Sequence, residues 1–333
     1  MGASRGLPWN VYHGHPARNL KPPFEHEKKP VGSGFPAFFM FWAFYYLNCA
    51  QKTTKMSTNY YLKTIPTRSE KPRDYGLTMV MDKGLSIRAV EDMIDASGDY
   101  IDIVKLGWAT SYVYKHLSEK LEVYRQAGIP TYFGGTLFEA FAIRDQMDDY
   151  QRALDKYKME YCEVSDGSIE LDHEEKCAYI SRLAQQVTVL SEVGSKDAEK
   201  IIPPYQWIRL MQSELEAGAW KVIGESREAG NVGLFRATGE VRSGLVQEIL
   251  TKIPSEKIIW EAPQKAQQVW FIELIGPNVN IGNIKPSEVI PLETIRLGLR
   301  GDTFNFFLDL AEKGVDLETL RPTLFDHSNG RLL

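Results

Sequence analysis

The segment Leu77–Gly98, which reads LTMVMDKGLSIRAVEDMIDASG, decides the fold class. It starts with the short apolar run Leu77–Met81, which is typical of a buried strand. Charged and glycine residues follow at Asp82–Gly84, and apolar residues then recur at helical spacing over Ile87–Ile94. A strand, a polar turn and an amphipathic helix in this order make one βα unit.

The same unit recurs along the chain. Eight short apolar or β-branched runs begin 21 to 37 residues apart, so each gap has room for one crossover helix. The predicted strands are Leu77–Met81, Ile101–Lys105, Thr131–Phe133, Tyr161–Val164, Val187–Leu190, Lys221–Ile223, Ile258–Trp260 and Val279–Ile281. Eight βα units predict a single (β/α)8 TIM barrel. A doubly wound open sheet is the alternative, but no G-x-G-x-x-G follows the first strand and no Walker A motif is present.

Apolar stripes and end signals predict the intervening helices. Two stripes of four apolar residues each have the spacing of a single helical face, and Gly218 is expected to end the second of these helices. Asp172, with Glu175 three residues on, resembles a capping box at a helix start, and Gly98 is expected to close the first helix. The stripes are Val113, Leu117, Leu121 and Tyr124, and Trp207, Leu210, Met211 and Leu215.

The composition is that of an ordinary globular protein. The chain has 333 residues, of which 43% are hydrophobic and 25% charged, which excludes collagen-like and mostly disordered classes. The net charge is -5, but it is unevenly distributed: residues 1–55 carry a net charge of +5, and the rest of the chain is acidic. An acidic body argues against nucleic acid as a partner. The three cysteines have no paired spacing, so we expect a reducing, cytoplasmic location.

The first 55 residues do not follow the βα pattern. Their apolar run Phe35–Leu47 has 13 residues, whereas a membrane-spanning helix needs about 20, so we expect no membrane span. We expect residues 1–55 to be a poorly structured leader upstream of a natural start at Met56; a cleaved or anchoring leader is the alternative. The barrel is then expected over residues 56–310, with a tail or final helix at 311–333.

Charged residues gather at the predicted strand ends, where a barrel carries its active site. Carboxylates at these positions suit a hard divalent cation such as Mg2+, and the cations suit phosphate, carboxylate or sulfonate oxygens. A surface charge or an ion pair at the barrel rim explains any single one of them. Because burying many charges is costly unless they pair or hold a ligand, the set indicates a metal-assisted enzyme for a small polyanion. The residues are Asp82, Glu163, Asp166, Glu192, Glu225 and Glu261, and Lys83, Lys105, Lys196, Arg227 and Lys265.

Taken together, the strand-end segments resemble the phosphosulfolactate synthase family over about residues 60–306. Several separate blocks match in the right order, which is more specific than any one block. The blocks include Gly76–Gly84, Gly98–Trp108, Gly134–Glu139, Glu163–Ser168, Glu192–Gly194, Glu225–Glu228, Glu261–Lys265 and Leu299–Phe304.

The resemblance implies a (β/α)8 barrel that joins sulfite to phosphoenolpyruvate with Mg2+ and forms (2R)-phospho-3-sulfolactate. It places the proton donor at Lys196, for which a phosphate contact is the alternative role. Our metal candidates are Asp166, Glu192 and Glu225. The substrate-binding candidates are Lys83, Lys105, Arg227, Lys265 and Gln268. Pairing with barrel carboxylates is the alternative for Lys83 and Lys105, and helix capping is the alternative for Gln268.

Two other functions remain open at this stage. One is a paralogous barrel enzyme that uses another enol phosphate or another nucleophile. The other is a non-catalytic, stress-related scaffold of the same fold. We expect small-molecule substrates rather than nucleic acid or membrane, and we expect a homo-oligomer.

Overall fold

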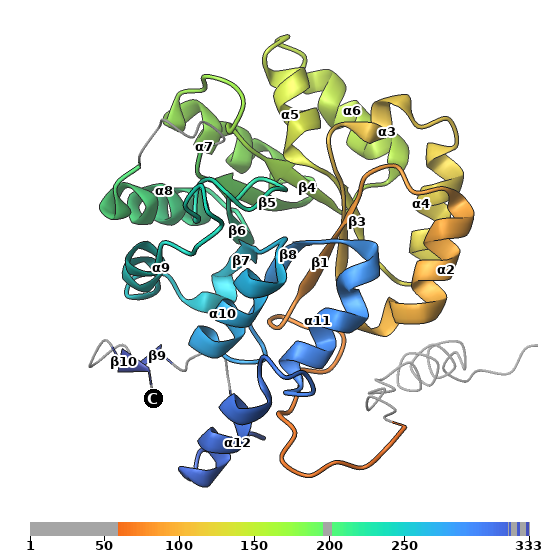
Figure 1. Cartoon of the computed structure of the whole chain (residues 1–333). Helices are drawn as coiled ribbons and strands as arrows, with labels where there is room; N and C mark the ends of the chain where they lie inside the picture. The colour runs from red at the N-terminus through yellow and green to blue at the C-terminus, as the bar shows by residue number, and fades with distance from the viewer. Residues whose placement is uncertain (1–58, 196–201, 319, 321–324, 327–330, 333) are drawn as a thin grey trace, which may run out of the picture. The chain divides into compact units, whose positions relative to one another are not determined.

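The computed structural model describes residues 59–195, 202–318, 320, 325–326 and 331–332. Eight parallel strands close into a barrel in chain order, as the sequence predicts (Figure 1). The predicted leader at residues 1–55 lies outside the described residues. The strands are β1 (Thr78–Asp82), β2 (Ile103–Leu106), β3 (Thr131–Phe133), β4 (Tyr161–Val164), β5 (Thr188–Val193), β6 (Lys221–Gly224), β7 (Ile258–Glu261) and β8 (Ile281–Ile284).

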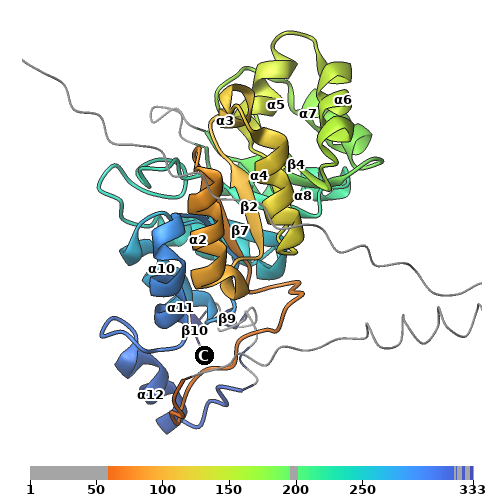
Figure 2. The same cartoon turned by 90° about the vertical axis from the view of Figure 1, so that its right-hand side faces the viewer.

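Helices surround the strands in both views (Figures 1 and 2). Within the described residues, none is long and apolar enough to cross a membrane. The helices are α2 (Ile87–Ser97), α3 (Thr110–Val113), α4 (Leu117–Gln126), α5 (Gly135–Ala142), α6 (Met147–Tyr157), α7 (His173–Leu183), α8 (Pro204–Glu216), α9 (Ser243–Leu250), α10 (Lys265–Ile275), α11 (Val289–Arg296) and α12 (Phe304–Glu312). Three short 3-10 helices are η1 (Gly98–Tyr100), η2 (Ser255–Lys257) and η3 (Pro286–Glu288), and β9 (Phe325–Asp326) pairs antiparallel with β10 (Arg331–Leu332).

Local sequence explains some helix ends and also the departures from prediction. Ser86 caps α2 and Asp172 caps α7 through their side chains. Gly98 has right-handed backbone angles, because η1 continues directly from α2. Val113, predicted on one core stripe with Leu117, is 78% exposed since the chain leaves the helix between α3 and α4. The gap between β3 and β4 was expected to hold one crossover helix, and it holds two, α5 and α6.

Alternation along the strands determines which side chains enter the barrel. Met79, Ile103, Tyr132, Leu190, Ile223 and Ile259 belong to one buried cluster, while Val80, Val104 and their equivalents pack with the helices. The register pairs Met81 with Lys105 and Glu163 with Leu190, so Lys105 and Glu163 share the inner face with these apolar residues. The interior is therefore apolar in the middle and charged toward the carboxyl ends of the strands.

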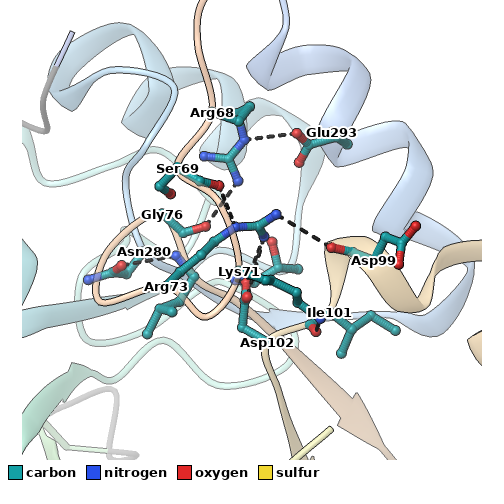
Figure 3. Close-up of polar contacts among 12 residues, drawn as sticks. Arg68, Ser69, Lys71, Arg73, Gly76, Asp99, Ile101, Asp102, Asn280 and Glu293 are labelled. Atoms are coloured by element: carbon teal, nitrogen blue, oxygen red, sulfur yellow. Dashed lines mark hydrogen bonds and ion pairs between the residues drawn. The ribbon is translucent and has the colours of Figure 1, made fainter. Parts of the chain in front are cut away.

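A polar network closes the opposite end of the barrel (Figure 3). The segment before β1 contributes Arg68, whose Nε lies 2.8 Å from Glu293 Oε1 on α11. Arg296, which is fully buried, donates to the carbonyls of Pro277 and Val279 at 2.6 and 2.7 Å. Asn280 Oδ1 accepts the Leu77 N–H at 3.0 Å. These bonds fix the amino ends of β1 and β8, a stabilising role typical of this face of a barrel.

Candidate active site

One lysine and four glutamates meet at the carboxyl end of the barrel interior. They come from five different strands or strand ends, and every one is buried. The residues are Lys105 on β2, Glu163 on β4, Glu192 on β5, Glu225 directly after β6, and Glu261 on β7.

Lys105 is the centre of this group. Its Nζ lies 3.0 Å from Glu163 Oε1, 3.3 Å from Glu192 Oε2 and 3.2 Å from Glu261 Oε1. Its side chain is 8% exposed, and those three carboxylates are at most 3% exposed. The three anionic partners keep the buried Lys105 amine protonated and fix the position of its Nζ.

Two glycines allow this close packing. The Gly135 N–H, at the start of α5, donates to Glu163 Oε1 at 2.7 Å. A Cβ on Gly135 would lie 2.6 Å from that same oxygen, and a Cβ on Gly134 would lie 3.1 Å from Lys105 Cε. The Gly-Gly sequence after β3 therefore lets a helix amino terminus contact a carboxylate.

Burial and mutual charge shift the pKa values of the group. Burial alone would lower the pKa of Lys105, but the three glutamates outweigh it and hold the pKa well above its usual value. Burial raises the pKa of Glu261 to about 7, with Lys105 opposing the rise and Glu192 and Glu163 adding to it. Burial likewise raises the pKa of Glu163. Lys105 thus stays an ammonium ion. Its single positive charge does not balance the surrounding carboxylates, so a further cation would stabilise their ionised form.

Three of the glutamates fit a divalent cation. One carboxylate oxygen from each of Glu192, Glu225 and Glu261 lies within 4.8 Å of the others. With all four glutamates ionised, Lys105 leaves an excess of three negative charges, which is costly in a buried site. Glu163 Oε2 is also buried without a hydrogen-bond partner among the described residues. An all-oxygen, strongly acidic set is the type that binds Mg2+, so the residues present fit this ion.

Comparison with known proteins identifies the family. The chain matches the sequence model of (2R)-phospho-3-sulfolactate synthase over residues 66–302. The chain belongs to the phosphosulfolactate synthase family. It is 43% identical to the phosphosulfolactate synthase of Methanothermobacter thermautotrophicus over 244 residues, which are 72% of this chain and 95% of that protein.

Two further relatives agree. The chain is 42% identical to the Bacillus subtilis phosphosulfolactate synthase over 72% of this chain and 96% of that protein. It is 44% identical to the Methanocaldococcus jannaschii protein of the same name over 69% of this chain and 94% of that protein. The resemblance inferred from the strand-end segments is confirmed, and the chain is a member of an enzyme family.

The charged interior of this phosphosulfolactate synthase family member includes only part of the predicted site. Lys105, Glu192 and Glu225 lie within it. Asp166 does not: it lies in the loop after β4 and pairs with Lys176 at 2.9 Å. Glu261 takes its place beside Glu192 and Glu225 in the group that fits a metal.

The other predicted anion-binding residues lie near the carboxyl ends of strands. Lys83 pairs with Glu228 and lies 4.7 Å from the centre of the Trp108 ring. Lys265 pairs with Asp302 at 2.9 Å and is about half exposed. Arg227, in the loop after β6, is exposed. These three cations follow the carboxyl ends of β1, β6 and β7.

Gln268 and Lys196 complete the predicted set. Gln268 is buried on α10, and its amide nitrogen donates to the Ala262 carbonyl at 3.0 Å. This hydrogen bond connects α10 to the loop after β7. Lys196 lies outside the described residues.

Sequence reasoning placed Glu261 at a strand end without choosing it as a ligand. The usable signal was that Glu163, Glu192 and Glu261 each occupy the last inward position of their strands.

Proposed function

We propose that the protein catalyses the Mg2+-dependent addition of sulfite to phosphoenolpyruvate, which gives (2R)-phospho-3-sulfolactate. Membership of the phosphosulfolactate synthase family supports this reaction. The observation that carries the proposal is the buried group of Lys105 with Glu192, Glu225 and Glu261 at the carboxyl end of the barrel. Such a group suits a metal ion and an anionic substrate together.

The reaction makes one carbon–sulfur bond and one carbon–hydrogen bond. The sulfite lone pair forms the bond to C3, and the C2–C3 π electrons move toward the substrate carboxylate. A proton added to C2 then completes phosphosulfolactate. Mg2+, held by Glu192, Glu225 and Glu261, would supply electrostatic stabilisation for the charge that develops on the carboxylate.

Two lysines have different proposed roles. Lys105 is a poor acid, since its glutamate partners raise its pKa, and it instead neutralises and orients Glu192 and Glu261. Lys196, which follows β5 in the sequence, is our proposed donor of the proton to C2. We assign Lys83, Arg227 and Lys265 to the phosphate and sulfonate oxygens, for which Lys83 and Lys265 would exchange their present carboxylate partners.

Product formation by the full chain tests this function. Phosphoenolpyruvate, sulfite and Mg2+ are incubated with wild type, Lys196→Ala and the neighbouring control Lys200→Ala, and products are followed by 31P NMR and mass spectrometry. We expect phosphosulfolactate from wild type and Lys200→Ala, and its loss with a chelator. Loss of one stabilising or proton-donating group commonly costs about 100-fold or more in rate, which is expected for Lys196→Ala.

The outcomes separate the parts of the proposal. Equal product from wild type and Lys196→Ala would keep the reaction and remove Lys196 as the acid. No product from a folded, metal-binding wild type would overturn the sulfite reaction and favour another enol phosphate or nucleophile. A folded protein indifferent to both substrates and Mg2+ would favour a non-catalytic scaffold.

A further inference from the structure

Strand β8 contains an irregularity at the level of the charged group. Thr78 of β1 pairs with Ile281, but Val80 pairs with Ile284, so β8 has one extra residue in this interval. Ile281 and Ile284 are both buried in the core between the strands and the helices. The two residues between them, Gly282 and Asn283, therefore occupy the interior side of the strand. Bulges of this kind often redirect a side chain beside an active site.

Asn283 is held there in an unusual state. Its φ is 58°, in the left-handed region that asparagine enters more readily than most residues. It is only 4% exposed, yet its side-chain amide makes no hydrogen bond with any described residue, and Oδ1 is enclosed without a partner. Buried amides are nearly always hydrogen-bonded, so this one needs an explanation.

Asn280 shows the usual behaviour for comparison. Its Nδ2 donates to the carbonyls of Glu256 and Ile258 at 3.1 and 2.9 Å, and its Oδ1 accepts the Leu77 N–H. Asn280, three residues before Asn283, bonds backbone groups at the opposite end of the barrel, where the strands begin. Of these two buried asparagines, the one whose amide makes no hydrogen bond with a described residue lies at the end that carries the charged group. Backbone strain and an unsatisfied polar group together are typical of a position that binds a ligand.

The register places Asn283 near Glu261, one of the proposed metal ligands. Gly282 pairs with Glu261 of β7, and the Ala262 N–H donates to the Gly282 carbonyl at 3.1 Å. Asn283 is therefore one residue beyond the level of Glu261, toward the carboxyl end. The next strand, β1, adds only Met79 and Met81 to the interior, because Asp82 faces Lys120 of α4. Asn283 is the polar side chain of this otherwise uncharged β8–β1 wall, as far as the described residues extend.

We propose that Asn283 is a substrate-binding residue, whose amide donates a hydrogen bond to an anionic oxygen of the enol phosphate. This assignment rests on the proposed function. A neutral donor suits the position, because a lysine or arginine here would be drawn to the nearby glutamates, as Lys105 is. The enclosed atom without a partner is Oδ1, whereas Nδ2 is not fully enclosed and makes no hydrogen bond with a described residue, so its N–H groups are available to a ligand.

Substitution by glycine separates binding from structure. Asn283→Gly removes the amide and tolerates the positive φ, so we expect a melting temperature equal to or above that of wild type. The dissociation constant and KM for phosphoenolpyruvate, measured with Mg2+ by calorimetry and kinetics, should rise about 10- to 100-fold, the size of a hydrogen bond to a charged group. Asn283→Asp should bind more weakly still, because it brings a negative charge to an anion.

The control variant is Asn280→Ala, which should lower the melting temperature and leave phosphoenolpyruvate affinity unchanged. Wild-type affinity in Asn283→Gly, or a lower melting temperature of that variant, would overturn the assignment while leaving the reaction intact. If wild type itself binds no phosphoenolpyruvate, the proposed function fails, and the assignment fails with it.

Discussion

Replacing Lys105 by methionine tests the electrostatics of the charged group. The ammonium lies 3.0 to 3.3 Å from three buried carboxylates, and methionine keeps most of its volume without its charge. Loss of one partner from a buried ion pair costs about 3–5 kcal/mol, because the remaining charges have no compensation. We therefore expect Lys105→Met to lose about this much free energy of unfolding near neutral pH without metal.

The loss should depend on pH in a defined direction. Burial holds the pKa of Glu163 and Glu261 above the value in the unfolded chain, so protonation favours the folded state. Stability from such groups is present at low pH and falls as pH rises through the unfolded and then the folded pKa. Removing Lys105 raises the folded pKa values further. The deficit of Lys105→Met relative to wild type should therefore shrink toward acidic pH.

Urea unfolding at about pH 5.5 and about pH 8, with and without Mg2+, measures both effects. Lys265→Met is the matched control, since Lys265 is half exposed and pairs with one exposed carboxylate. It should change stability little at either pH. A Lys105→Met protein as stable as wild type, or a deficit independent of pH, would refute the electrostatic reasoning.

Three further predictions concern other positions. Gly135→Ala places a Cβ in collision with Ser165 Oγ and 2.6 Å from Glu163 Oε1, so it should destabilise by about 1–3 kcal/mol in chemical unfolding. Burial lowers the pKa of Lys221 to about 8, so between about pH 8 and 10.4 the unfolded chain binds more protons and stability rises with pH. Lys221→Met should abolish that rise in a pH series of unfolding curves. Burial raises the pKa of Cys162 to about 12, so mass-mapped alkylation near pH 8 should modify Cys162 only after denaturation.

The fold was predictable because each βα unit carries its own signal. Thr131–Phe133 and Tyr161–Val164 were predicted at their observed bounds, while β8 begins two residues later than predicted. Its bulge explains the difficulty, since Gly282 and Asn283 interrupt the apolar pattern. The start of α5 directly after β3 was not predicted, because its first residue, Gly135, is a poor helix former that the contact with Glu163 requires.

The site was only partly predictable, because a one-residue change of phase reverses the face of a strand. Asp82 and Lys105 both stand at strand ends, but Asp82 points outward to Lys120 and Tyr124 and Lys105 points inward. Asp166 lies beyond the end of β4, where alternation no longer constrains it, and its partner Lys176 is ten residues away on α7. Composition could supply the charged residues but not the register that selects among them.

Manganese binding, followed by EPR, most directly tests whether Glu192, Glu225 and Glu261 hold the divalent cation. Mn2+ is the probe, and Glu261→Gln is compared with wild type and with the loop variant Asp166→Asn. We expect one Mn2+ per chain in wild type and Asp166→Asn, displaced by Mg2+, and a large loss of affinity in Glu261→Gln. Unchanged Mn2+ binding by Glu261→Gln, together with its loss in Asp166→Asn, would contradict this assignment.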